Sequence, residues 1–248
     1  MRWTRGSVPE EVYTRAMAAR DPGPATIHWD DSTPIHLCIV EPRRHPLLPF
    51  ALNRAALLYK GRAGFTLVTS RPGRAAVEET LRGWTGHRVL LTEDLCGKSN
   101  LAIEEYNELM TSESFWRGFP ADRHVLIFQT DVLLLRPCDD AFLLYDYVGA
   151  PWPWQPPGTS WGVGGNGGYS LRYAGAMTEA IRRLERPPRE PEDVFYSRAA
   201  AMGIIQCPPT AVAAAFSAEH LPPPDGGRPT GVHQVYRFWD SETLDALL

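Results

Sequence analysis

The sequence HVLIFQTDVLLL at residues 124–135 is the most apolar run of the chain, and it decides the fold. Its first five residues have the character of a buried strand, and the polar residues Gln129, Thr130 and Asp131 follow directly. A buried carboxylate costs free energy unless it is paired or bound to a cation. Asp131 is therefore either a ligand for a divalent ion such as Mg²⁺ or Mn²⁺, or an acid satisfied by Thr130 and backbone amides at the strand end.

Upstream of this run, strand patterns alternate with helix patterns. The strand-like segments IHLCIVE at 35–41 and GFTLVTS at 64–70 are followed by helix-like segments at 47–61 and 74–84. This alternation is typical of βαβ units, so we predict an α/β fold with a mainly parallel central sheet flanked by helices on both faces. Open sheets of this kind bind ligands at the carboxyl ends of their strands, which is where the polar residues after Phe128 stand.

The composition indicates one packed globule. Of the 248 residues, 44% are hydrophobic and 22% are charged, and this length suits a single hydrophobic core. Residues 1–33 mix charge, proline and short apolar groups, and we interpret them as a peripheral N-terminal arm. The formal net charge of −4 argues against nucleic acid as a partner, because a phosphate backbone attracts basic proteins.

Cysteine spacing and hydropathy indicate the compartment. The four cysteines lie far apart and form no C-x-x-C pair, so neither a zinc cluster nor a dense disulfide framework is expected. The N-terminus lacks a signal-peptide pattern, and no window reaches the roughly 18 apolar residues of a membrane span. We therefore expect a soluble, cytoplasmic protein with no integral membrane segment.

The segment DYVGAPWPWQPPGTSWGVGGNGGYSLR at 146–172 is too irregular for ordinary core, and we predict a binding loop. Glycines around Asn166 permit positive φ angles and allow a ligand to approach the backbone, although a tight turn joining two strands is the simpler alternative. Trp152, Trp154 and Trp161 flank the glycines. They could stack on a sugar ring or a nucleobase, or simply cover a long loop.

Two further motifs carry groups that could do chemistry. In EDVFYSR at 192–198, Glu192 and Asp193 begin a predicted helix, and one of them could act as a general base. Acids in the first turn of a helix are also favoured by the helix dipole alone. His233, in the tripeptide GVH, is either a metal ligand or a structural hydrogen-bonding residue.

The order of these motifs is more specific than any one of them. The chain carries FQTD, DYVGAPW, GNGGYSLR, EDVFYSR and GVH in that sequence, beginning at residues 128, 146, 165, 192 and 231. In this it resembles an uncharacterised family of glycosyltransferases of the GT-A type, whose members read FQTD, YDYxGAPW, GNGGxSLR, EDVF and GxH. The resemblance spans roughly residues 35–237.

The resemblance implies a GT-A-like catalytic domain over residues 34–248. It also implies that Asp131 and His233 bind Mn²⁺ or Mg²⁺, although this chain has QTD, with one acid, where the GT-A fold has D-x-D. Asp193, or less favourably Glu192, would be the catalytic base of an inverting reaction. The nucleotide-sugar donor, expected to be UDP-linked, would contact residues spread along the chain: Glu41, Gln129, Thr130, Asp131, Trp152, Gly165, Asn166, Gly167 and Gly168.

The sequence thus favours a transferase that moves a sugar from a nucleotide donor to a hydroxyl of a glycan, a peptide or a small molecule. One alternative is a non-catalytic carbohydrate- or nucleotide-binding module that uses the tryptophans as platforms. Another is a nucleotidyltransferase or a nucleotide-sugar hydrolase, which would consume a nucleotide without needing a sugar acceptor.

Overall fold

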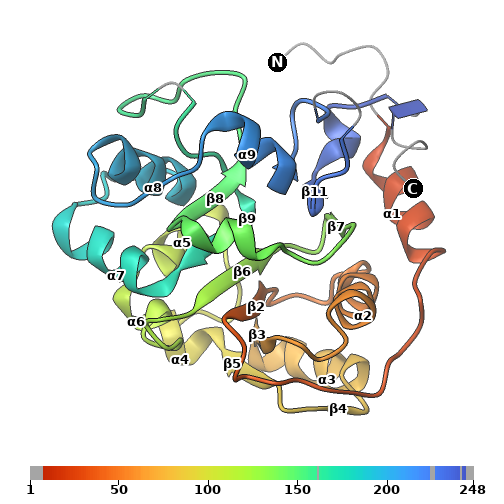
Figure 1. Cartoon of the computed structure of the whole chain (residues 1–248). Coiled ribbons are helices and arrows are strands. Elements are labelled where there is room, and N and C mark those ends of the chain that lie inside the picture. The colour runs from red at the N-terminus through yellow and green to blue at the C-terminus, as the bar shows by residue number, and fades with distance from the viewer. Residues whose placement is uncertain (1–7, 161, 224–226, 241, 244–248) are drawn as a thin grey trace.

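The computed structural model describes residues 8–160, 162–223, 227–240 and 242–243. Within them the central feature is a six-stranded sheet with the strand order β5-β3-β2-β6-β9-β8 (Figure 1). β2, β3, β5 and β6 are parallel neighbours, and β9 runs antiparallel to both β6 and β8. The strands span β2 Ile35–Val40, β3 Gly64–Thr69, β5 Arg88–Leu91, β6 His124–Phe128, β8 Tyr147–Ala150 and β9 Asn166–Tyr173.

Helices cover both faces of this sheet. The apolar residues of β2 alternate between the two faces, because Leu37 and Ile39 pack in one hydrophobic cluster and Cys38 and Val40 in another. The first cluster includes α2 (Leu48–Tyr59) and α3 (Arg71–Thr80). The second includes α5 (Ile103–Met110), α6 (Glu113–Trp116), α7 (Ala174–Arg183) and α8 (Glu192–Ala201). The predicted α/β fold with a mainly parallel sheet flanked by helices is confirmed.

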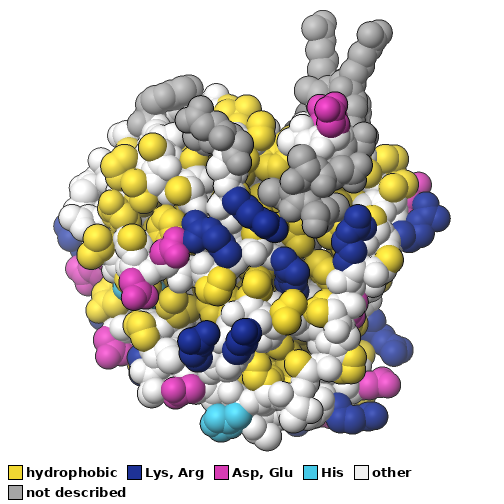
Figure 2. Space-filling model, turned by 45° about the vertical axis from the view of Figure 1, so that its right-hand side comes forward, with side chains coloured by type: hydrophobic (Ala, Val, Ile, Leu, Met, Phe, Trp, Pro, Cys, Tyr) yellow, Lys and Arg dark blue, Asp and Glu magenta, His cyan; other side chains and the backbone are white. Residues whose placement is uncertain are grey.

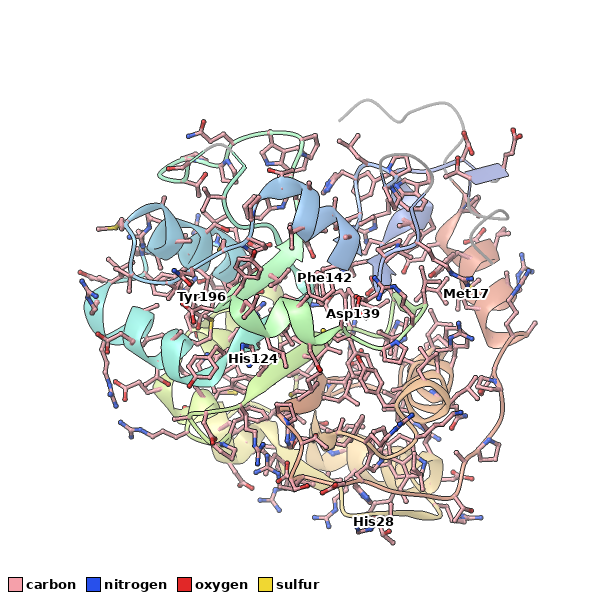
Figure 3. The ribbon with its side chains drawn as sticks, viewed as in Figure 1. Met17, His28, His124, Asp139, Phe142 and Tyr196 are labelled. Atoms are coloured by element: carbon pink, nitrogen blue, oxygen red, sulfur yellow. The ribbon has the colours of Figure 1, made fainter. Side chains whose placement is uncertain are left out.

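A third hydrophobic cluster lies beside the sheet. A small sheet of β10 (Ser217–Ala218), β11 (Gly231–His233) and β7 (Val132–Leu134) packs there with α1 (Glu10–Ala18) and η3 (Val235–Arg237). Phe142, Tyr196 and Met17 belong to the first, second and third clusters, and Figure 3 labels all three. The remaining elements are β1 Ile27–His28, β4 Trp84–Thr85, α4 Thr92–Cys96, η1 Asp140–Leu144 and α9 Thr210–Phe216.

The described part of the N-terminal segment packs closely against the rest of the chain. Trp29 belongs to the first core cluster, and β1 pairs with β4. Tyr13 and Met17 of α1 are buried, and Tyr13 stacks on Tyr236 of η3 with ring centroids 4.9 Å apart. Residues 1–7 of the predicted arm lie outside the described residues.

The segment 146–172, which we predicted to be a binding loop, is irregular only in its middle part, over the described residues between Ala150 and Asn166. Its two ends form β8 and β9, and the motif GNGGYSLR enters the sheet at Asn166. The strands approach so closely that a Cβ on Gly149 would lie 2.2 Å from the carbonyl oxygen of Asn166. Glycine is therefore needed here for backbone contact between two strands, which the local pattern does not reveal.

The surface carries both hydrophobic and charged side chains. On the face turned forward in Figure 2, Lys and Arg side chains stand among hydrophobic ones, while acidic side chains lie mainly towards the edges. None of the helices among the described residues is long and apolar enough to cross a membrane.

Candidate functional site

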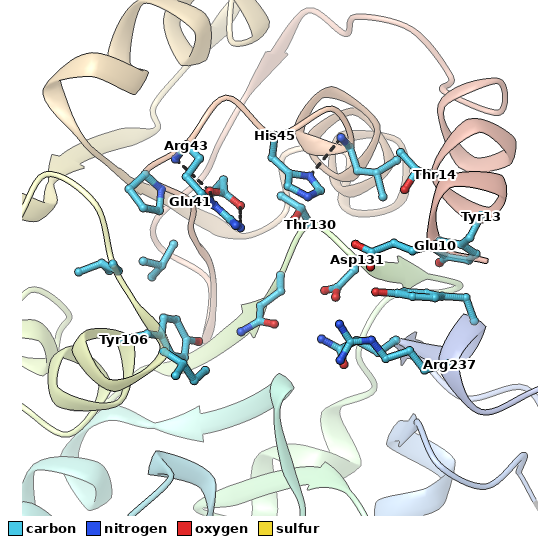
Figure 4. Close-up of a pocket in the computed structure, with 18 of the residues that line it drawn as sticks. Glu10, Tyr13, Thr14, Glu41, Arg43, His45, Tyr106, Thr130, Asp131 and Arg237 are labelled. Atoms are coloured by element: carbon cyan, nitrogen blue, oxygen red, sulfur yellow. Dashed lines mark hydrogen bonds and ion pairs between the residues drawn. The ribbon is translucent and has the colours of Figure 1, made fainter. Parts of the chain in front are cut away.

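A pocket of about 340 Å³ opens at the carboxyl ends of β2 and β6 (Figure 4). β3 lies on one side of β2 and β6 on the other, so the strand order reverses at this point of the sheet. Open α/β sheets bind their ligands at such a crevice. The segment after β6 contributes Gln129, Thr130 and Asp131 to the pocket, and α1, α5, η3 and the segment after β2 contribute the other walls.

Asp131 meets His233 at the edge of this pocket. The two residues come together because β7, which follows Asp131, pairs with β11 so that Val132 lies opposite His233. His233 Nε2 lies 3.3 Å from Asp131 Oδ1 and 3.1 Å from Gln129 Oε1. The side chains of Gln129, Asp131 and His233, which come from two distant parts of the sequence, therefore lie close together.

Behind His233 stands a second acid, Glu219, which the sequence did not suggest. Its Oε1 lies 3.2 Å from His233 Nδ1 and accepts a hydrogen bond from Asn166 Nδ2 at 3.3 Å. Burial alone would lower the pKa of His233, but the carboxylates of Asp131 and Glu219 outweigh it and raise this pKa to about 10. Burial alone would likewise raise the pKa of Asp131, but His233 lowers it to about 2. In the metal-free chain an imidazolium is thus held between two carboxylates.

The start of β9 separates two groups of buried charges. A Cβ on Gly168 would lie 2.3 Å from His233 Cε1, and a Cβ on Gly167 would lie 2.0 Å from Glu192 Oε1. The Gly168 amide donates to Asn166 Oδ1 at 2.8 Å. Glycine is therefore needed at both positions because the side chains of His233 and Glu192 lie against the backbone of the strand.

Glu192 and Asp193 are neighbours with different surroundings. Glu192 accepts hydrogen bonds from Arg172 Nη1 at 2.6 Å and Nη2 at 3.0 Å, and the side chains of this pair are 5% and 0% exposed. Asp193 forms no ion pair with any described residue, and its Oδ2 accepts a hydrogen bond from the Gly167 amide at 3.3 Å. Burial and the nearby charge of Glu192 raise the pKa of Asp193 to about 7, against the opposing effect of Arg172.

The pocket also holds residues that sequence reasoning missed. Both carboxylate oxygens of the predicted donor residue Glu41 are taken by Arg43, through Nε at 2.8 Å and Nη2 at 2.9 Å. Both residues line the pocket, where Glu41 is already paired with Arg43. Arg237 of η3 and Glu10 and Tyr13 of α1 complete the opposite wall (Figure 4). The basic residues Arg43 and Arg44 could be seen in the sequence, but no sequence pattern in α1 indicated that it would line a pocket.

The other predicted donor residues lie around the edge of this arrangement. Thr130 lines the pocket, while Gly165 is buried between β8 and α8, where its amide donates to Ser197 Oγ at 3.3 Å. Trp152 is half-buried and Trp154 is exposed. Trp161 lies outside the described residues. Over the described ranges, no group of three or more His, Cys, Asp or Glu residues is placed to hold a metal.

The chain matches a protein family over residues 94–233, which is more than half of its length. The family is described as "Protein of unknown function (DUF5672)". The chain belongs to this family. The matched region of this DUF5672 protein contains Asp131, the glycine-rich strand, Asp193 and His233, whereas α1, Arg43 and Arg237 lie outside it.

No curated protein matches the chain. Among solved structures, it is similar to mouse xyloside xylosyltransferase 1 in its apo form, with 12% identity, a TM-score of 0.49 and coverage of 78% of this chain and 87% of that one. It is also similar to the mannosyltransferase PcManGT from Pyrobaculum calidifontis in complex with GDP-Man and Mn²⁺, with 14% identity, a TM-score of 0.46 and coverage of 90% and 64%. At these values the likenesses say nothing about the activity of this chain.

Proposed function

We propose that the chain is a glycosyltransferase that moves a sugar from a nucleotide-sugar donor, expected to be UDP-linked, to a hydroxyl acceptor. The observation that carries this proposal is the pairing of Asp131 with His233 at a pocket on the reversal point of the sheet, with the unpaired acid Asp193 held at the adjoining strand. The first group suits a cation and a diphosphate, and the second suits a proton acceptor.

The charges that line the pocket favour a divalent cation as part of the site. Glu10, Glu41 and Asp131 provide one more negative charge than Arg43 and Arg237 provide positive charge. Burial lowers the pKa of His45, so its imidazole is neutral at pH 7. A diphosphate alone would therefore meet a net negative lining, whereas one divalent cation reverses the sign.

Three side chains fit such a cation. Asp131 Oδ1 and Gln129 Oε1 are both within 3.3 Å of His233 Nε2, and atoms that share one ion with bonds of about 2.1 Å lie roughly 3 Å apart. The amide oxygen of Gln129 would take the place of the missing first acid, with His233 in its neutral form. Mn²⁺ or Mg²⁺ held there would neutralise the charge that develops on the departing diphosphate. Donor oxygens and water would complete its shell.

Asp193 is the proposed general base. As the acceptor oxygen attacks the anomeric carbon, the bond from that carbon to the phosphate oxygen breaks and its electron pair leaves with the nucleoside diphosphate. The acceptor proton passes to Asp193, whose raised pKa makes it a stronger base than an exposed carboxylate. A single displacement of this kind inverts the anomeric centre. Glu192 cannot serve because Arg172 occupies both of its oxygens.

The pocket walls have separate roles in this proposal. Arg43 is fixed by its two contacts with Glu41, so its free Nη1 is oriented before the donor arrives. Arg237 faces it from η3 and lies outside any ion pair among the described residues. We propose that these two guanidinium groups bind the diphosphate from opposite sides.

The test is nucleotide release from a panel of UDP-, GDP-, CMP- and dTDP-sugars in Mn²⁺, Mg²⁺ or EDTA, with and without hydroxyl acceptors. We expect metal-dependent release from one donor, and its loss in Asp193→Asn with donor binding retained. Glu190→Gln, an acid on the segment before α8 that pairs with Arg198, is the matched control. Binding without any turnover would favour the binding module, and release that gives only free sugar with every acceptor would favour a hydrolase.

A further inference from the structure

Three aromatic rings from distant parts of the chain form a surface that we call the aromatic shelf: Trp154, His220 and Phe238. His220 lies between the other two, with ring centroids 4.4 Å from Trp154 and 4.0 Å from Phe238. Trp154 meets His220 edge-on at 84°, and its side chain is 47% exposed. The shelf is therefore built by tertiary contacts, and Trp154 is its most exposed member.

Two of the three shelf residues are chain neighbours of residues in the proposed site. His220 follows Glu219, which contacts both His233 and Asn166 at the start of β9. Phe238 follows Arg237, which lines the pocket. The backbone that carries the shelf is thus continuous with residues of the proposed site.

The chemistry of the shelf suits a hydroxyl-bearing ring. An exposed indole face packs against the apolar C–H face of a sugar, and the indole N–H, the His220 imidazole and nearby amide and carboxylate groups can bond its hydroxyls. A lipid chain would leave these polar groups without partners.

We propose that the aromatic shelf is the acceptor site and that the acceptor carries a sugar ring that stacks on Trp154. This inference rests on the proposed transferase activity, and it names the acceptor class of that activity. Neither the family match nor the pocket at β2 and β6 includes this surface as a whole, because Trp154 and His220 do not line that pocket and Phe238 lies beyond residue 233.

The experiment measures binding of p-nitrophenyl glycosides of xylose, glucose, galactose and mannose by calorimetry, with UDP and Mn²⁺ present. Wild type is compared with Trp154→Ala, Trp154→Phe and the control Leu144→Ala, which removes an exposed apolar side chain from η1. We expect at least one glycoside to bind, Trp154→Ala to weaken it about tenfold, and Trp154→Phe to keep most of the affinity. Leu144→Ala should match wild type.

A second measurement separates this inference from the proposed function. In donor turnover, the ratio of transfer to hydrolysis should fall about tenfold in Trp154→Ala. If no glycoside binds wild type, or if Trp154→Ala binds as wild type does, the shelf is not the acceptor site. If glycosides bind through Trp154 but no donor is ever turned over, the shelf stands as a saccharide site and the transferase proposal fails.

Discussion

Two clusters of buried charge lie on opposite sides of the first residues of β9, and they differ in how completely they are satisfied. In the closed cluster, Arg172 bonds both oxygens of Glu192, Ser170 Oγ and the Gly167 carbonyl, and lies over the rings of Tyr147 and Tyr196. In the open cluster, His233 lies 3.3 Å from Asp131 and 3.2 Å from Glu219, and Asp131 lines the pocket. We infer that the closed cluster stabilises the fold, whereas the open cluster can bind a ligand through Asp131.

Breaking the closed cluster should have the largest effect on stability. Arg172→Met leaves the Glu192 carboxylate buried without its partner, and we expect the free energy of unfolding to fall by roughly 3–5 kcal/mol. Urea denaturation measures this loss. Arg74→Met removes an exposed pair with Glu78 and should cost at most about 1 kcal/mol. Equal losses in the two variants would mean that the closed cluster has no special structural role.

The pH profile tests whether Asp193, next to the closed cluster, works as a base. Because burial and Glu192 raise its pKa to about 7, it must lose its proton to act, and kcat/KM should fall about tenfold for each pH unit below that value. The folded state holds this proton more tightly than the unfolded state. The stabilising contribution of Asp193 is thus complete below the unfolded pKa and is lost as the pH rises through about 7.

Asp193→Asn removes that titration. We expect the variant to be inactive but more stable than wild type above neutral pH, since it never carries a buried charge. A flat activity profile between pH 5 and 8, or an active Asn variant, would assign the base to another residue.

Loosening the open cluster should reduce metal affinity with little loss of stability. Glu219→Gln removes the charge behind His233, and residues that orient a metal ligand in this way contribute about 10- to 100-fold to affinity. Titration with Mn²⁺ in the presence of UDP measures the effect. The control Glu190→Gln should leave the affinity unchanged. An unaltered affinity in Glu219→Gln would show that His233 does not need Glu219 to bind the ion.

The smallest effect is expected at the Glu41–Arg43 pair. Unlike the two clusters, this pair has one buried member, Glu41, and one largely exposed member, Arg43. Glu41→Gln frees Arg43 from its fixed orientation, and UDP affinity should fall by about threefold to tenfold, or roughly 1 kcal/mol. Arg44→Gln is the control, since Arg44 does not line this pocket. A loss as large in Arg44→Gln would mean that only the general charge of the segment matters.

The sequence predicted correctly those features that depend only on neighbouring residues along the chain. The apolar run at 124–128 forms β6, and the polar residues after it reach the pocket, because the end of a parallel strand in an α/β sheet is placed by the pattern itself. Pro191 and the acids after it begin α8 as expected. The loop prediction for 146–172 missed the strands at its two ends, because the glycines there fit a crowded pair of strands, a constraint that only the neighbouring strands and side chains impose.

The rest of the site depends on contacts between distant segments. His233 meets Asp131 only because β11 pairs with β7, about a hundred residues apart, and a three-residue strand carries too little pattern to predict its partner. Glu219 lies in a short apolar stretch with no motif around it. Tyr13 reaches the pocket because α1 packs on η3 at the other end of the chain.

Calorimetric titration of UDP and GDP into wild type and Asp131→Asn, each in Mn²⁺ and in EDTA, tests the central claim most directly. We predict that wild type binds one of these nucleotides in Mn²⁺ and at least about tenfold more weakly in EDTA, because the pocket lining is otherwise net negative. Asp131→Asn should bind weakly in both. Equal binding by wild type with and without metal, undiminished Mn²⁺-dependent binding by Asp131→Asn, or no binding of either nucleotide would contradict a metal and diphosphate site at Asp131.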